Sequence, residues 1–184
     1  LHVCDKNMEK IPTSMTTHKL LAEVCYAAQQ EGKSITGRYP QYQTKYNDSP
    51  SEMCTMLARS FADIGDIIRG RDLFYGNTQE KKQRKQLDKN LKTIFEKIKR
   101  NNEDLKSLSL DKVREYWWAL NRQDVWKAIT CDDELKDNRY FRQTCDDSGT
   151  LSHANHKCRC RSKNGQHDTN QVPTYFDYVP QYLR

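Results

Sequence analysis

The sequence predicts an all-α fold, a disulfide-stapled helical bundle with long ordered loops. Four segments of the 184-residue chain repeat apolar residues at the i, i+3, i+4 spacing of amphipathic helices. Only 35% of the residues are hydrophobic and 30% are charged, which suits helices with narrow apolar stripes. The helical period is lost from residue 131 to residue 172, a stretch that holds four of the seven cysteines. A polar loop of that length needs cross-links, so we expect disulfides there.

The first helix is predicted over residues 17–31. Its apolar face consists of Leu20, Leu21, Val24, Cys25 and Ala28. Gly32 is interpreted as the residue that stops this helix. Residues 33–48, with three tyrosines and Pro40, lack a helical period, so we predict an aromatic-anchored loop there.

The second helix begins with a strong start signal. Ser49 can cap it, Pro50 suits the first helical position, and Glu52 can close a capping box. The helix then runs to Gly70. Its core side chains are Met53, Met56, Leu57, Ser60, Phe61, Ile64, Ile67 and Ile68.

The third helix, predicted over residues 79–101, is apolar on one stripe and basic elsewhere. The stripe consists of Leu87, Leu91, Ile94, Phe95 and Ile98. The basic residues that we expect to face solvent are Lys81, Lys82, Arg84, Lys85, Lys89 and Lys92.

A fourth helix is predicted from a Ser109 cap to about Thr130. Its apolar residues are Leu110, Val113, Tyr116, Trp117, Leu120, Val125 and Ile129. Because this helix carries all three tryptophans, more than one narrow stripe can bury, we expect Trp118 to meet another segment of the fold. At the end of the chain, Pro180 can open a final helix, and the aromatic residues around it should dock on the bundle or lead into a further subdomain.

The cysteine count is odd, so at least one thiol needs a partner outside the chain or stays free. Disulfides are favoured because the last three cysteines lie in a polar stretch where free thiols would be exposed to oxidation. The residues His153, His156, Cys158 and Cys160 are candidate ligands of a zinc ion. Their Cys-x-Cys and His-x2-His spacing fits a structural zinc site poorly, so we expect no metal.

The net charge of +6 is concentrated in two stretches. Residues 69–100 hold eleven Lys or Arg against four acidic residues, and residues 139–163 hold six against two. Such surfaces suit a polyanionic partner such as a sulfated glycan or nucleic acid, or they are simply solvated helix faces. The candidate glycan-binding residues are the six cations of the third helix, with Arg139, Arg142, Arg159 and Arg161 as a second set.

Several functional classes lack their sequence signals. No apolar run approaches the roughly 20 residues that cross a bilayer, and no signal-peptide pattern opens the chain, so we expect any anchor outside this segment. No nucleophile elbow, phosphate loop or zinc-protease motif occurs, so we expect neither an enzyme nor a cofactor. Asp63 and Asp66 are interpreted as polar contacts of a helix rather than metal ligands. No nucleic-acid module accompanies the basic residues, so nucleic acid is not an expected partner.

Long blocks of this sequence are similar to those of a known family. The two longest are ARSFADIGDIIRGRDLF (58–74) and VPTYFDYVPQYLR (172–184). Further matches are REYWW (114–118), VWKAITC (125–131) and YFRQTC (140–145), with LHVC (1–4) and LAEVC (21–25) in the earlier part. Over essentially its whole length, the chain resembles the alpha-type Duffy-binding-like domain of the variant erythrocyte membrane adhesins of Plasmodium falciparum (erythrocyte membrane protein 1).

The resemblance implies a fold of three helical subdomains. Residues 1–16 would end the first, and residues 178–184 would start the third. Residues 17–177 would form the second, a four-helix bundle with a disulfide-rich loop over residues 131–172.

The resemblance also implies an adhesion domain on the extracellular face of the infected erythrocyte membrane. Its expected partners are a host-cell receptor protein or a sulfated glycan such as heparan sulfate, in rosetting or cytoadherence. Adjacent domains of the same adhesin and antibodies are further expected partners. The alternative is a domain that mainly supports a neighbouring receptor-binding domain.

Finally, the resemblance implies a disulfide between Cys54 and Cys131, and a partner for Cys4 outside the chain. Cys25, Cys145, Cys158 and Cys160 then remain for two bridges. Because Cys158 and Cys160 are too close in sequence to join each other readily, we expect one to pair with Cys145 and the other with Cys25.

Overall fold

The computed structural model describes residues 16–46, 51–73, 77–147, 149–161 and 170–184. Its four helices are α1 (Thr17–Tyr46), α2 (Ser51–Arg69), α3 (Thr78–Arg100) and α4 (Leu110–Ile129). One antiparallel hairpin, β1 (Gln143–Asp147) and β2 (Thr150–His153), and short 3₁₀ turns complete the described part. The prediction of a disulfide-stapled helical bundle is confirmed, whereas the hairpin was not predicted.

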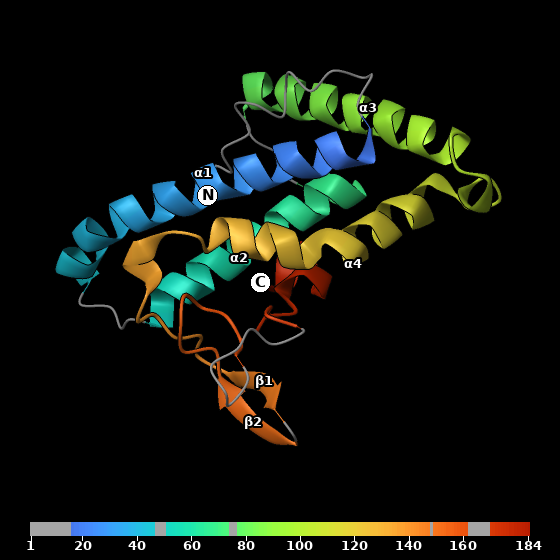
Figure 1. Ribbon diagram of the computed structural model, residues 1–184. Coiled ribbons are helices and arrows are strands. Elements are labelled where there is room, and N and C mark those ends of the chain that lie inside the picture. The colour runs from blue at the N-terminus through green and yellow to red at the C-terminus, as the bar shows by residue number, and fades with distance from the viewer. Residues whose placement is uncertain (1–15, 47–50, 74–76, 148, 162–169) are drawn as a thin grey trace.

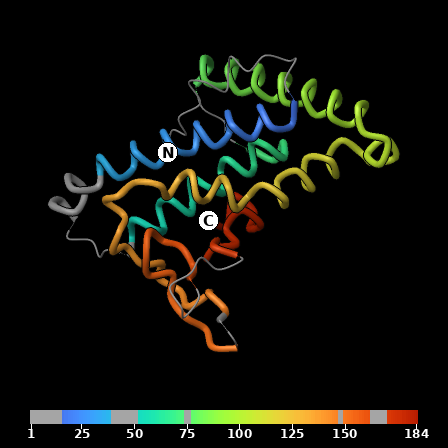
Figure 2. Tube along the Cα trace, viewed as in Figure 1, coloured from blue at the N-terminus to red at the C-terminus, as the bar shows by residue number. Residues whose placement is uncertain are grey.

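Helix α4 occupies the centre of the bundle and packs against the other three helices (Figure 1). Helix α3 lies on the outside, and the hairpin lies at the opposite end of the molecule (Figure 2). Between α2 and α4, the ring centroid of Phe61 lies 5.1 Å from those of both Trp118 and Trp126. Phe95 of α3 meets Trp117 edge-on at 5.9 Å. These aromatic pairs stabilise the core beyond their buried area.

Helix α1 is longer than predicted. It continues through residues 33–46, so the predicted loop is wrong over that range. Gly32 does not stop the helix, because it marks the point where α1 passes closest to α4. A Cβ at this position would lie 2.0 Å from the carbonyl oxygen of Ile129. Ile35 is also buried, so the inward face of α1 extends beyond the glycine.

The helix starts were predicted with mixed success. Ser49 and Pro50 lie outside the described residues, so the predicted cap of α2 is not tested. Helix α3 begins one residue earlier than predicted, at a capping box that the sequence analysis missed. The Asn77 side chain accepts a hydrogen bond from the Glu80 N–H, and the Asn77 N–H donates to the Glu80 carboxylate, each at 3.0 Å. Ser109 caps α4 as predicted.

Two residues of α4 predicted to be buried are exposed. Tyr116 and Leu120 are 52% and 82% exposed, whereas Arg114 and Arg122 are buried. These arginines and Trp118 recur every four residues, and this row faces the bundle. The positions of the apolar residues alone therefore predicted one edge of the buried stripe wrongly. Trp118 does meet another segment, as predicted, because its indole N–H donates to Asp177 at 2.9 Å.

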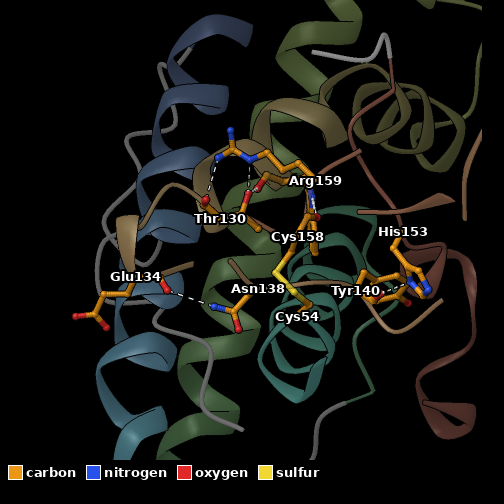
Figure 3. Close-up of a disulfide and its surroundings, with 9 residues drawn as sticks. Cys54, Thr130, Glu134, Asn138, Tyr140, His153, Cys158 and Arg159 are labelled. Atoms are coloured by element: carbon orange, nitrogen blue, oxygen red, sulfur yellow. Dashed lines mark hydrogen bonds between the residues drawn. A yellow bond between two sulfur atoms is a disulfide. The ribbon is translucent and has the colours of Figure 1, made fainter. Parts of the chain in front are cut away.

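Two disulfides hold the segment that follows α4. Cys54 is bonded to Cys158 (Figure 3), and Cys145 is bonded to Cys160. The implied bridge between Cys54 and Cys131 is therefore wrong. The bond of Cys145 to Cys160 is one of the two pairings that the sequence left open. The bridge at Cys54 closes a loop of 104 residues, so it restricts the unfolded chain strongly.

Cys158 reaches Cys54 because its backbone is fixed on α4. The indole N–H of Trp126 donates to the Cys158 carbonyl at 3.1 Å. Cys25 and Cys131 are half-buried and form no disulfide with another described cysteine, so the expected bridge of Cys25 to Cys158 or Cys160 is wrong. Burial, reinforced by the nearby carboxylate of Asp124, raises the pKa of the Cys25 thiol to about 11. Cys4 lies outside the described residues.

The other elements at the end of the chain are short. Pro180 precedes a single 3₁₀ turn, Gln181–Leu183, rather than a longer helix. Tyr175, Tyr178 and Tyr182 remain exposed, while Thr174 and Asp177 are buried against the bundle. Within the described ranges, no helix is long and apolar enough to cross a membrane.

Candidate functional site

Helix α3 presents basic side chains on a fixed support. The buried side chains on its inner side are Leu87, Leu91, Ile94 and Phe95. The capping box at Asn77 holds its first turn. Five of the six predicted cations are exposed, namely Lys81, Lys82, Lys85, Lys89 and Lys92. The helix lies at the edge of the bundle (Figure 1).

Some of the predicted cations of α3 are engaged in ion pairs. Arg84 is half-buried and lies 3.5 Å from the carboxylate of Asp72. Lys92 lies 2.8 Å from Asp88, which also binds Arg114 at 3.2 Å. Burial of the Asp88 carboxyl opposes its ionisation, but hydrogen bonds from Lys92 and Arg114 outweigh burial and lower its pKa.

Three lysines form the accessible part of the basic face. Lys82, Lys85 and Lys89 are exposed and have no ion pair among the residues that the structure describes. Their i, i+3, i+7 spacing places them on one side of the helix. The row spans about 10 Å along the axis. We call Lys82, Lys85 and Lys89 the lysine row.

The second predicted set does not join this face. Arg139 and Arg142 are exposed beside the hairpin, and Arg142 stacks on Phe141, with 5.0 Å between its guanidinium carbon and the ring centroid. Arg161 is half-buried. Because α3 and the hairpin lie at opposite ends of the molecule, the two sets cannot form one continuous surface (Figure 2).

Arg159, from the second set, has a structural contact. Its guanidinium donates to the carbonyl oxygens of Lys127 and Thr130 at 2.7 and 3.0 Å, and to the Thr130 hydroxyl at 2.7 Å (Figure 3). A cation at these carbonyls complements the negative end of the α4 dipole. Arg159 thus fixes the loop that carries Cys158 and is not available as a free surface charge.

The zinc ligands considered from the sequence are not available either. Cys158 and Cys160 are both oxidised in disulfides. Among the described residues, no group of three or more His, Cys, Asp or Glu side chains could hold a metal ion.

The family of this chain follows from a family model that covers its whole length. The model of the Duffy binding domain matches residues 1–184. This chain belongs to the Duffy-binding domain family. Its family and its fold are those of adhesion domains rather than enzymes.

Solved Duffy-binding-like domains share this fold. The NTS-DBL1(alpha-1) domain of the Plasmodium falciparum membrane protein 1 (PfEMP1) from the varO strain is 37% identical, with a TM-score of 0.75, and the match covers 99% of this chain and 40% of that one. The PfEMP1 IT4var13 DBLbeta domain bound to ICAM-1 is 30% identical, with a TM-score of 0.67, again over 99% of this chain and 40% of that one. No curated protein matches the chain. This Duffy-binding segment thus spans about two fifths of these solved chains.

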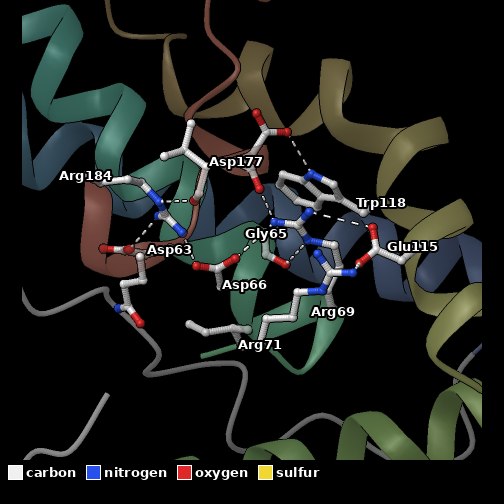
Figure 4. Close-up of polar contacts among 12 residues, drawn as sticks. Asp63, Gly65, Asp66, Arg69, Arg71, Glu115, Trp118, Asp177 and Arg184 are labelled. Carbon is white, nitrogen blue, oxygen red and sulfur yellow. Dashed lines mark hydrogen bonds and ion pairs between the residues drawn. The ribbon is translucent and has the colours of Figure 1, made fainter. Parts of the chain in front are cut away.

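In this Duffy-binding domain, a buried ionic network joins the two longest sequence blocks, 58–74 and 172–184 (Figure 4). Asp177 of the second block is 1% exposed. Its carboxylate accepts hydrogen bonds from the Arg122 guanidinium at 2.8 and 2.9 Å, in addition to the Trp118 indole. Arg69 of the first block binds Asp66 at 3.0 Å and the Asp177 carbonyl.

The end of the chain closes the same network. Arg184 pairs with Asp63 at 3.0 Å and with Asp66 (Figure 4). Burial raises the pKa of both carboxyl groups, although Arg184 opposes this effect. The interpretation of Asp63 and Asp66 as polar contacts of a helix is therefore confirmed, but the sequence analysis did not identify their partners. A signal for the wider network was Arg122, a cation in the tryptophan-rich helix α4 whose partner is Asp177.

Proposed function

We propose that this chain is part of an adhesion domain on the extracellular face of the infected red cell, and that it binds host-cell receptors. Membership of the Duffy-binding family supports this proposal. So does the similarity to the PfEMP1 domain solved with ICAM-1, since that protein binds a host-cell surface molecule. The network around Asp177 and the two disulfides provide a rigid scaffold for surface binding.

The proposed ligand at α3 is a sulfated glycan of the heparan sulfate type. The observation that carries this choice is the lysine row. A polyanion with closely spaced sulfates can contact several ammonium groups along one helix, and the attraction weakens as salt screens the charges. Because α3 is packed along its inner side, binding does not require the helix to become ordered first.

Charge reversal of the outer two lysines tests this function. We expect Lys82→Glu with Lys89→Glu to weaken heparin binding by roughly 5- to 30-fold at physiological salt, since each exposed pair contributes up to about 1 kcal/mol and is replaced by repulsion. The test compares the natural protein containing residues 1–184 with the variant. The measurement is the salt concentration at which each elutes from immobilised heparin.

The matched control is Lys33→Glu with Arg38→Glu. Both residues are exposed cations of α1, so the net charge changes equally while the lysine row stays intact. We expect only a small reduction of the eluting salt in the control. Equal reductions in the two variants would show a response to net charge and would refute a site on α3.

A further inference from the structure

A cavity of about 390 Å³ opens between the end of α2 and the first half of α3. Its volume lies in the range of small-molecule sites, roughly 300–1,000 Å³. Ile67, Leu73 and Leu87 form its apolar wall. Ile67 and Leu87 belong to the core, with 6% and 1% exposure, so their part of the wall is fixed. Leu73 is 55% exposed and therefore lies where the cavity meets solvent.

Charged side chains line the other side of the cavity. Lys81, Arg84 and Lys85 contribute cations, and Asp72 and Asp88 contribute carboxylates. Each carboxylate already faces an arginine, because Asp72 pairs with Arg84 and Asp88 with Arg114. Lys85 has no ion pair within the described part of the chain. The cavity therefore combines an apolar wall with an ammonium group that can bind an anion.

We propose that this cavity binds one sulfated sugar unit of the glycan that lies along α3, an inference that rests on the proposed function. A pyranose ring has an apolar C–H face and carries its sulfate groups at the ring edge. The apolar face suits the wall of Ile67, Leu73 and Leu87, while a sulfate can accept charge-assisted hydrogen bonds from the Lys85 ammonium. A polyanion without an apolar face would gain nothing from the wall.

The cavity and the rest of the face are separable. Lys85 belongs both to the lysine row and to the cavity, whereas Lys82 and Lys89 do not line it. The cavity would thus fix one sugar unit by shape, while Lys82 and Lys89 attract the rest of the glycan by charge. A short glycan should therefore depend on the cavity, and a long one on both.

Titration calorimetry with a trisulfated heparin disaccharide tests the inference. The test uses the natural protein containing residues 1–184 and its Leu73→Trp variant, which fills the mouth of the cavity without a change of charge. We expect saturable binding to the parent protein and at least about tenfold weaker binding to Leu73→Trp, a difference that titration resolves. Lys85→Gln, which keeps the side chain but removes the cation, should weaken binding similarly.

The control is the double variant Lys33→Glu with Arg38→Glu on α1, which changes the net charge away from the cavity and should bind the disaccharide within about threefold of the parent. Equal binding of a non-sulfated disaccharide, or unchanged binding by both Leu73→Trp and Lys85→Gln, would overturn the cavity site. If long heparin binds the parent but the disaccharide does not, the cavity site is refuted and the lysine row stands. If neither binds, the proposed function itself fails.

Discussion

At the scale of single residues, two glycines of α1 have opposite surroundings. A Cβ on Gly32 would overlap the Ile129 carbonyl oxygen, at 2.0 Å, whereas a Cβ on Gly37 would meet nothing within 4 Å. Glycine in a helix costs about 1 kcal/mol relative to alanine. Close packing of α1 on α4 explains why a glycine stands at position 32 in spite of this cost. The structure gives no reason for a glycine at position 37.

Alanine substitutions at these positions should have opposite effects. We expect Gly32→Ala to lower the free energy of unfolding by about 1–3 kcal/mol, because overpacking against the α4 backbone outweighs the better helix propensity. Gly37→Ala is the matched control and should raise the free energy of unfolding by up to about 1 kcal/mol. Urea denaturation measures both changes. Changes of the same sign and size would contradict the packing role of Gly32.

At the scale of elements, α3 differs from the central helices because one side is packed and the other carries the lysine row. Its start is fixed locally by the reciprocal bonds of Asn77 and Glu80, rather than by burial. The first turns of α3 include Lys82 and Lys85. The geometry of the lysine row therefore depends on the cap.

Removal of the cap should loosen the first turn of α3. We expect Asn77→Ala to lower the free energy of unfolding by about 1 kcal/mol and to speed hydrogen exchange of the Glu80 amide, which loses its acceptor. Asn77→Asp keeps a side-chain oxygen and should retain protection. Hydrogen exchange of the parent and both variants provides the measurement. An unchanged exchange rate at Glu80 in Asn77→Ala would refute the role of the cap.

At the scale of the whole molecule, local patterns predicted the helices and missed the long-range contacts. The buried stripes of α2 and α3 repeat within a few residues, so periodicity was sufficient to predict them. The partner of Cys54 was not predictable in this way, because it depends on where the loop near Arg159 crosses the end of α4. Arg69 and Asp177 are 108 positions apart, and no local pattern connects them.

The candidate site was predicted in part for the same reason. The sequence identified every member of the lysine row, since exposed lysines on an amphipathic helix follow from its period. It could not show that Arg84 and Lys92 are engaged by acids, that Arg159 holds α4, or that a cavity adjoins Lys85. Each of these facts depends on segments that meet only in the folded chain.

We propose that the domain adheres to host cells through a sulfated glycan. The most direct measurement is the binding of the natural protein to host cells before and after heparinase treatment, with chondroitinase as the matched control. We predict that heparinase removes most of the binding, that chondroitinase leaves it, and that added salt reduces it. Binding that persists unchanged after complete heparinase digestion would contradict the account and indicate a receptor of another kind.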